Sequence, residues 1–424
     1  MPRRSPRAAR GPPRQSAAGL VLGVQAILQG FQRERLSQML AARRLTQAQL
    51  ASLVGVSPAT VSKWRAGSQA PEREALDRLA GVVNVTPEWF TRPPAEKLSL
   101  PLFRSNASAH VAARAMLEAR LEWAQDIALS LSEFVDFPAV NLPNRDFADP
   151  EEITAGEIEL AAIECRDVWR LGRAAIEDLA LAIEGAGVVL VREETGIAQI
   201  EGLSAWSSLL GRPLVLLSAD KDNGYRSRFD LAHELGHLIL HRHIARPTDR
   251  ERHKQLEKQA HQFAGAFLLP AETFAAEVRM PITLDDLLLL KRRWGVSVGA
   301  IVMRLRALKV LDEESAQALF KRRSARWGAK SEPGDGDRPP ERPRLLRRTF
   351  DLLVDENVMP LDAIPRHLGL AAHDIELLAG LPEGYFQGRA NVVQFARMRQ
   401  PADGSNDRGS QGSTVVPFRS PRNS

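Results

Sequence analysis

The sequence predicts a mainly helical fold with a small β-sheet, divided over several domains. The chain has 424 residues, which is more than one hydrophobic core usually serves. Its apolar residues recur mostly at helical spacing, and stretches rich in Pro and Gly separate the helical blocks. The hydrophobic content of 44% and charged content of 26% are ordinary for a globular protein.

Residues 1–30 form a basic arm, in which five arginines precede residue 15 and no acid accompanies them. Such an arm is either a disordered extension or a contact for nucleic-acid phosphates. The stretch 17–31 has the apolar character of a signal-peptide core, but Gln25 and Gln29 interrupt it, so we expect a cytoplasmic protein. No apolar run is long enough to span a bilayer, and no membrane partner is expected. The single cysteine, Cys165, excludes a disulfide framework and a Cys-rich zinc finger.

Residues 31–95 predict short helices joined by sharp turns. Thr46 and Ser57 can each cap a helix with a side-chain oxygen, and Pro58 suits a first helical turn. Gly55, between these two helices, permits a tight turn. The helix that starts after Ser57 exposes polar and basic side chains, as a helix that enters the major groove of DNA would.

The run 45–51, followed by Gly55-Val56-Ser57 and Val61-Ser62-Lys63-Trp64, resembles the lambda-repressor-like, or XRE, helix-turn-helix family. The resemblance implies a helical bundle that binds double-stranded DNA, with Gln47 near phosphates and Lys63 near bases. The alternative is that Gln47 only caps its helix and Lys63 is solvated. Because one small module contacts few phosphates, we expect a homodimer. The candidate DNA-binding residues are Gln47, Ser57, Ala59, Thr60, Ser62 and Lys63.

Residues 96–150 contain one long amphipathic pattern, at 108–136, which predicts a connecting helix. In residues 151–327, helical patterns accompany strand candidates at 187–191 and 213–217. This mixture predicts an α+β domain.

A metal-binding pattern, His233-Glu234-Leu235-Gly236-His237, lies in a segment with helical period. Two histidines four residues apart share one helix face and can bind one zinc ion through imidazole nitrogens. Glu234 can reach a zinc-bound water and act as its base. Such a pattern also arises by chance, but the other faces of this helix are apolar, whereas an exposed helix would leave both histidines solvated.

A zinc site of this kind needs a third protein ligand. His243 lies six residues beyond the second histidine, as in metzincins, but that family has a glycine where Leu240 stands, so we set His243 aside. Glu257 is the better candidate because it shares a helix face with Ala260 and Ala264. Small residues on that face let two helices pack closely, which would bring the carboxylate to the metal.

The histidine helix, followed by Glu257-x-x-Ala260-x-x-Phe263-Ala264-x-x-x-Leu268-x-Pro270, resembles the ImmA/IrrE family of metallopeptidases. The likeness to fused XRE plus ImmA/IrrE regulators covers most of residues 31–388. It implies a zincin-like α+β domain with Zn²⁺ held by His233, His237 and Glu257 and with Glu234 as the catalytic residue. Many members carry a second glutamate where Gln259 stands, which favours Glu257. His241 and His261 are alternatives, more typical of residues that support a ligand or lie on the surface.

The rest of the chain carries no catalytic pattern. Residues 328–343, rich in Pro, Gly and charge, predict an exposed linker. Residues 344–388 predict a C-terminal helical region, and residues 389–424 a disordered tail.

These patterns predict a DNA-binding transcriptional regulator with a zinc-dependent endopeptidase domain. By the family resemblance, the substrate would be a helix-turn-helix repressor or the chain itself. The alternative is a non-catalytic repressor or antitoxin whose metallopeptidase-like domain acts as a sensor or binds a partner.

Overall fold

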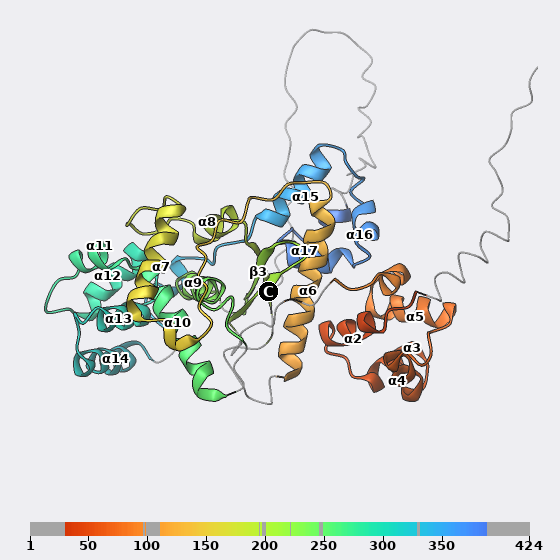
Figure 1. Cartoon of the computed structure of the whole chain (residues 1–424), viewed down its shortest axis with the longest axis horizontal. Coiled ribbons are helices and arrows are strands. Elements are labelled where there is room, and N and C mark those ends of the chain that lie inside the picture. Colours follow the sequence, from red (N-terminus) through yellow and green to blue (C-terminus); the bar gives the residue numbers. More distant parts are fainter. Residues whose placement is uncertain are drawn as a thin grey trace, which may run out of the picture. The chain divides into compact units, whose positions relative to one another are not determined.

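The computed structural model describes residues 30–387 apart from 96–97, 99–110, 195, 197–200, 221, 246–248 and 329–330. The basic arm up to residue 29 and the C-terminal tail therefore lie outside the described residues. Within the described part the fold is mainly helical with one three-stranded sheet (Figure 1), which confirms the expected fold class. No helix in this part is both long and apolar enough to cross a membrane.

The N-terminal helices are short, and local capping defines their ends. They are α2 (Arg33–Ala42), α3 (Gln47–Val54), α4 (Pro58–Ala66), α5 (Arg73–Val83) and the 3-10 helix η1 (Pro87–Thr91). The Thr46 hydroxyl accepts a hydrogen bond from Gln49 N at 3.2 Å, and Ser57 Oγ accepts one from Thr60 N at 3.1 Å. Gly55 ends α3 with a φ of 77°, a value that glycine adopts without strain. The helix-turn-helix order is thus built from contacts within a few residues.

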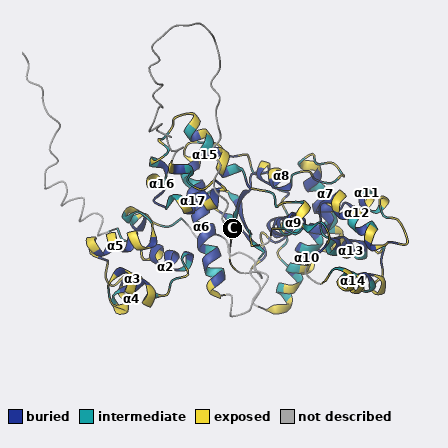
Figure 2. Cartoon of the chain, turned by 180° about the vertical axis from the view of Figure 1, so that it is seen from behind, coloured by how far each residue is buried: buried dark blue, intermediate teal, exposed yellow. Residues whose placement is uncertain are grey.

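The connecting helix is α6 (Val111–Ser132), and it packs against α2. Buried residues run along most of its length, as Figure 2 shows. Trp123 of α6 meets Trp89 of η1 edge to face, with ring centroids 6.0 Å apart. Aromatic and aliphatic burial therefore joins the N-terminal helices to α6.

The sheet has the order β1-β3-β2, in which β1 (Val189–Glu193) runs parallel and β2 (Gly202–Ser207) antiparallel to the central β3 (Arg212–Ser218). Successive side chains point to opposite faces. Val189 and Leu214 join the core that contains α6, whereas Leu190 and Val215 join the core beneath the following helices. β1 and β3 correspond to the two strand candidates of the sequence, but β2 has no counterpart among them.

The remaining helices follow the sheet or flank it. They are α7 (Ala155–Val168), α8 (Leu179–Gly185), α9 (Gly224–Leu240), α10 (Arg250–Leu268), α11 (Ala271–Ala276), α12 (Leu284–Trp294), α13 (Val298–Ala307), α14 (Glu313–Trp327), α15 (Leu345–Asp355), α16 (Ala363–Leu368) and α17 (Ala372–Ala379), with 3-10 turns η3 (Pro150–Glu152), η4 (Asp335–Asp337) and η5 (Tyr385–Gln387). The residues of α15 to α17 and η5 fall in the expected C-terminal helical region, and they pack on α6 and β1.

Glycine at position 236 brings α9 and α10 close together. A Cβ atom there would lie 3.2 Å from both the Cα and the carbonyl oxygen of Ala260 and 3.2 Å from Cβ of Phe263. Contacts this short are tighter than most Cβ contacts, so a side chain at this position would require α10 to shift by a few tenths of an ångström. The two helices approach at this point because Gly236 faces the small Ala260.

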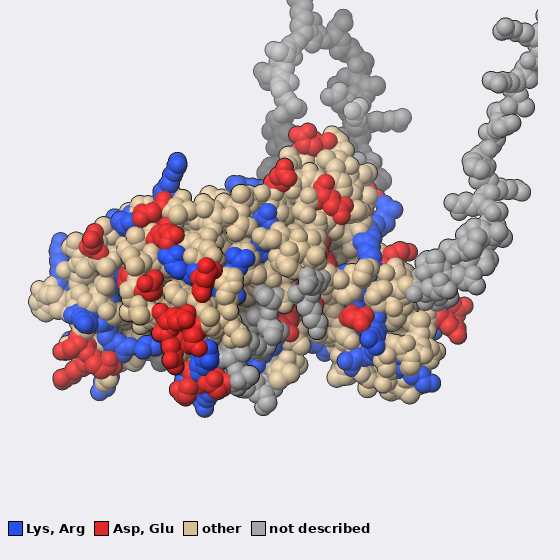
Figure 3. Space-filling model, viewed as in Figure 1, with Lys and Arg blue, Asp and Glu red and all other residues tan. Residues whose placement is uncertain are grey.

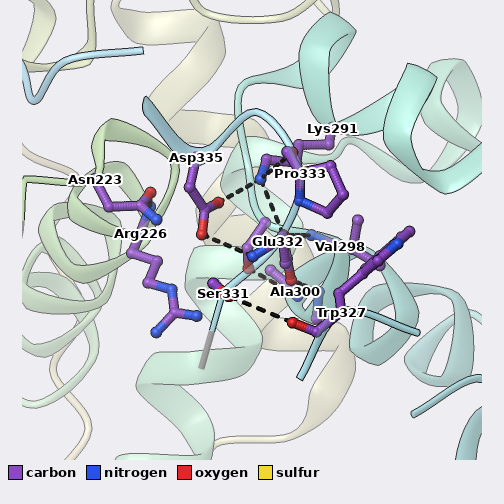
Figure 4. A network of polar contacts seen from close by, with 12 residues as sticks. Asn223, Arg226, Lys291, Val298, Ala300, Trp327, Ser331, Glu332, Pro333 and Asp335 are labelled. Atoms are coloured by element: carbon purple, nitrogen blue, oxygen red, sulfur yellow. Dashed lines mark hydrogen bonds and ion pairs between the residues drawn. The ribbon is translucent and has the colours of Figure 1, made fainter. Parts of the chain in front are cut away.

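The segment that composition suggested as an exposed linker is anchored at several of its described residues. Glu332 has a side chain only 1% exposed and accepts hydrogen bonds from Val298 N at 2.9 Å and Gly299 N at 3.2 Å, so it caps α13 (Figure 4). The buried Lys291 pairs with Glu332 at 3.2 Å and with Asp335. Further along, Arg338 O accepts from Gly224 N at 2.9 Å, where α9 begins.

A charge cluster beside α6 joins segments that are far apart in the sequence. Asp374 of α17 accepts hydrogen bonds from Arg43 of α2 at 2.8 Å and from Arg120 of α6 at 2.7 Å. Arg120 also pairs with Glu193, at the end of β1, at 2.6 Å. Burial opposes the ionisation of Asp374, but the two guanidinium groups outweigh it and hold the pKa of this carboxyl below its usual value.

Candidate metal centre and DNA-facing surface

His233 and His237 lie one turn apart on α9, with their Nε2 atoms 3.0 Å from each other. Both residues are buried, at 8% and 4% exposed. The helix turns both imidazoles to one side because a spacing of four residues repeats the helical period.

Glu257 of α10 faces this histidine pair. Its Oε2 lies 3.5 Å from His233 Nε2 and its Oε1 lies 3.6 Å from His237 Nε2. Burial raises the pKa of Glu257, but the two imidazoles opposite outweigh it, so the pKa of this carboxyl lies well below its usual value and the carboxylate is ionised. The structure thus brings together the three residues proposed as ligands.

The three side chains fit a tetrahedral metal ion. Ligand atoms bound at zinc distances in a tetrahedron lie about 3.3 Å apart, and the three donor pairs here are 3.0, 3.5 and 3.6 Å apart. Both oxygens of Glu257 are buried and have no hydrogen-bond partner among the described residues. A buried, ionised carboxylate without a hydrogen-bond partner raises the free energy of the folded state unless a cation binds to it.

Packing between the two helices explains why Glu257 reaches the histidines. Ala260, which touches Gly236, lies three residues after Glu257 and therefore on the same face of α10. Gly236 immediately precedes His237. We therefore expect a larger residue at position 236 to move the carboxylate away from the imidazoles.

Glu234 is buried next to this group, and its carboxyl also contacts β2. Its Oε2 accepts a hydrogen bond from Ser204 Oγ of β2 at 2.7 Å. Burial raises the pKa of Glu234 to about 7, although the His237 charge and the Ser204 hydrogen bond act in the opposite direction. A carboxyl with such a pKa can both accept and release a proton near neutral pH.

The sequence did not reveal Ser204, because β2 itself was not expected. Gly202 at the start of β2 shows how tightly the strand covers the acid: a Cβ atom there would lie 3.2 Å from Glu234 Cγ. The alternation of small, apolar and polar residues in β2 gives a strand only through its pairing with β3.

A chain of hydrogen bonds sets the tautomer of His237. Gln259 Nε2 donates to the carbonyl oxygens of Pro150 and Ile153, at 2.7 and 3.2 Å. Gln259 Oε1 therefore accepts from His241 Nε2, at 3.2 Å. Burial, reinforced by the His237 charge, lowers the pKa of His241 well below its usual value, so this imidazole is neutral.

Neutral His241 with its hydrogen on Nε2 has a lone pair on Nδ1. His237 Nδ1 lies 2.9 Å away and donates to it. Donation from Nδ1 leaves Nε2, the atom that faces Glu257, as the nitrogen of His237 that would bind a metal ion. His241 orients His237 through this hydrogen bond without belonging to the metal-binding group, and Gln259 orients His241 in the same way.

The other histidines near α9 lie differently. His243 has a side chain 45% exposed and stands 3.7 Å from Asp146. His261 stacks on Phe229, with ring centroids 5.6 Å apart, and tilts against His233 at 4.5 Å. Neither joins the three residues whose donor atoms lie within 4.8 Å of one another.

A cleft of about 1010 Å³ opens beside Glu257 and runs along α10 toward the start of α13. Arg226 and Phe229 of α9 line it, with Glu201 just before β2 and His253 of α10. This volume lies at the upper end of the range for ligand pockets. Glu257 is the member of the candidate metal centre that lines this cleft.

The candidate DNA-binding residues lie on the surface around α4. Val61 and Trp64 are buried at 0% and 1% exposed, which turns the opposite face of α4 outward. Ser57, Ala59, Ser62 and Lys63 are exposed, while Gln47 and Thr60 are partly exposed. Thr60 and Ser57 hydroxyl oxygens lie 2.8 Å apart, so these two groups also bond each other.

Two family models match the chain. A helix-turn-helix model matches residues 36–90, and a model of the IrrE N-terminal-like domain, of the M78 peptidases, matches residues 183–306. The expected combination of an XRE-type helix-turn-helix with an ImmA/IrrE-like domain is thus confirmed, and the first match supports DNA binding. His233, His237 and Glu257 all lie in the second matched segment. No curated protein matches the chain.

Proposed function

We propose that this protein is a DNA-binding transcriptional regulator whose second domain is a zinc-dependent endopeptidase. The observation that carries the proposal is the meeting of His233, His237 and Glu257 from two helices, with Glu234 left outside that group. Two imidazoles and one carboxylate make a common catalytic zinc set, which leaves a position for water. When bound, the zinc ion would polarise a carbonyl and lower the pKa of water.

Glu234 is the residue proposed to move the proton. It takes a proton from the attacking water and returns it to the amine that leaves, which its pKa of about 7 permits. Ser204 holds the carboxyl in place through the 2.7 Å hydrogen bond. Burial of Glu234 excludes bulk water from this step, so the carboxyl exchanges its proton with the reactants.

β2 offers a place for an extended peptide. In the described part of the chain it pairs only with β3 and is an edge strand of the sheet, and we propose that a strand of the substrate adds to this edge. The strand holds Ser204, the partner of Glu234. A peptide added along β2 would therefore pass the acid, which favours a protein substrate over a small one. We propose a helix-turn-helix repressor or the chain itself as that substrate.

DNA binding is assigned to the exposed face of α4. Figure 3 shows basic and acidic side chains interspersed on the face that it draws, so we rely on position in the helix-turn-helix rather than on a broad basic field. Gln47, Ser57, Ala59, Thr60, Ser62 and Lys63 form the proposed contact set, within a homodimer that doubles the number of phosphate contacts. A cytoplasmic location agrees with DNA as partner.

The second candidate function is a non-catalytic repressor or antitoxin, in which the metal domain senses a ligand or binds a partner. The anchored charge cluster of Arg43, Arg120, Asp374 and Glu193 favours it. These contacts connect α2 with the end of β1. Through them, a ligand bound to the metal domain would alter DNA binding by the N-terminal helices.

The test compares wild type, Glu234→Gln and the control Glu251→Gln, whose side chain on α10 is 80% exposed. We would measure zinc content, binding to duplex DNA, and cleavage of the chain itself and of repressors encoded nearby. The endopeptidase proposal predicts that Glu234→Gln keeps zinc and DNA binding and loses cleavage, while Glu251→Gln resembles wild type. If wild type with bound zinc cleaves none of these proteins, the sensor function replaces it.

A further inference from the structure

His253 is a second histidine of α10 that the sequence patterns did not single out. It lies four residues before Glu257, and therefore one turn earlier on the same face of the helix. Its side chain is only 12% exposed, and it lines the cleft beside the candidate metal centre.

The Nε2 atom of His253 has no hydrogen-bond partner among the described residues, although it is buried. The nearest charged oxygen is Glu257 Oε1, at 4.0 Å, which is too far for a hydrogen bond. A buried ring nitrogen without a hydrogen-bond partner costs free energy. An acceptor atom that entered the cleft would remove that cost.

His253 stands beside the metal-binding group without belonging to it. The three residues whose donor atoms all lie within 4.8 Å of one another are His233, His237 and Glu257. A donor just outside such a group can hydrogen-bond to a substrate oxygen that would lie beside the metal-binding residues. The position of His253 suits that role better than the role of a fourth ligand.

We propose that His253 is a catalytic residue that donates a hydrogen bond from Nε2 to the carbonyl oxygen of the peptide bond being cleaved. This proposal rests on the proposed endopeptidase function and names the group that stabilises charge in it. The water oxygen bonds to the carbonyl carbon, its proton moves to Glu234, and the π electron pair of the carbonyl moves to its oxygen. The pair then re-forms the carbonyl as the C–N bond breaks, and Glu234 returns the proton to the nitrogen. His253 keeps its own proton throughout and stabilises the charged oxygen.

The test uses the full chain loaded with Co²⁺ and methylphosphonate, a small tetrahedral oxyanion, as the probe. The visible spectrum of bound cobalt reports both metal affinity and binding of the anion. We expect His253→Ala to keep its cobalt affinity and to bind methylphosphonate at least about tenfold more weakly, as the loss of a hydrogen bond to a charged group predicts. His253→Gln keeps an N–H donor and should fall between His253→Ala and wild type. It carries the test if His253→Ala does not fold.

Lys254→Ala is the matched control, because the neighbouring Lys254 lines the same cleft and pairs with the exposed Glu251 at 2.7 Å. It should bind cobalt and methylphosphonate as wild type does. The proposal is overturned if His253→Ala and wild type bind the anion equally, if wild type binds none, or if His253→Ala loses cobalt. Because no step of this measurement needs turnover, absence of cleavage would refute the endopeptidase function separately.

Discussion

Replacing His241 by phenylalanine tests whether the hydrogen-bond chain behind His237 tunes the metal centre. His241 is buried at 3% exposed, so a ring of similar size preserves the packing. The change removes the acceptor that lies 2.9 Å from His237 Nδ1 and the donor that lies 3.2 Å from Gln259 Oε1. His237 would then be free to carry its hydrogen on Nε2, the wrong nitrogen for binding the metal.

The expected loss follows from the position of His241 behind a ligand. Removing such a partner typically weakens metal affinity by about 10–100-fold, which corresponds to about 1.4–2.7 kcal/mol. The assay is competition for zinc between the full chain and a chromophoric chelator at one fixed pH. We expect His241→Phe to lose affinity in this range.

His243→Phe is the matched control, since His243 is two residues away, has a side chain 45% exposed and lies outside the metal-binding group. Its zinc affinity should stay within about twofold of wild type. An unchanged affinity in His241→Phe would show that the orientation of His237 does not depend on this chain.

Three further predictions concern stability and DNA binding. Burial raises the pKa of Glu184 to about 7, above its usual value of 4.5, so its protonated form is favoured in the folded state. The stabilising contribution of this protonated form is complete below pH 4.5 and is lost as pH rises through 7. When the pH is lowered from 8 to 5, the free energy of unfolding of wild type, measured in denaturant, should increase by up to about 3 kcal/mol relative to that of Glu184→Gln. Parallel pH profiles of the two proteins would contradict this. Asp374→Asn removes the carboxylate that the buried Arg120 and the partly exposed Arg43 share and should lower the free energy of unfolding by about 3 kcal/mol. The control Asp362→Asn, in an exposed pair with a side chain 74% exposed, should change it by less than about 0.5 kcal/mol, and equal effects of the two substitutions would show that the charge cluster does not stabilise the fold. In a fluorescence titration with duplex DNA, Lys63→Ala should bind more weakly than wild type, and the salt dependence of its binding constant should fall by about one counterion. The control Lys254→Ala, on α10, should change neither quantity.

The parts of the site that the sequence predicted are those set by short-range geometry. His233 and His237 share a face because they are four residues apart on one helix. Thr46 caps α3 by bonding to a residue three positions later, a contact that composition and spacing already indicate. Glu257 was predicted as a ligand from small residues on its own helix, and the contact between Gly236 and Ala260 is the packing that this requires.

The parts that the sequence did not predict depend on neighbours far away along the chain. β2 is too short and too mixed in polarity to be recognised alone, so Ser204 stayed hidden although it bonds Glu234 from 30 residues away. Gln259 reaches Pro150 across 109 residues. His253 has no distinctive neighbours in the sequence.

The amino-acid sequence alone determined the two domain types, the helix-turn-helix order and the histidine pair, because each follows from spacing within one or two helical turns. Only the tertiary structure decided which side chain bonds Glu234, which nitrogen of His237 faces Glu257, and which buried ring nitrogen lies beside the cleft without a partner. Those properties are set by distances between atoms on different elements, and such distances exist only once α9, α10 and β2 have packed together.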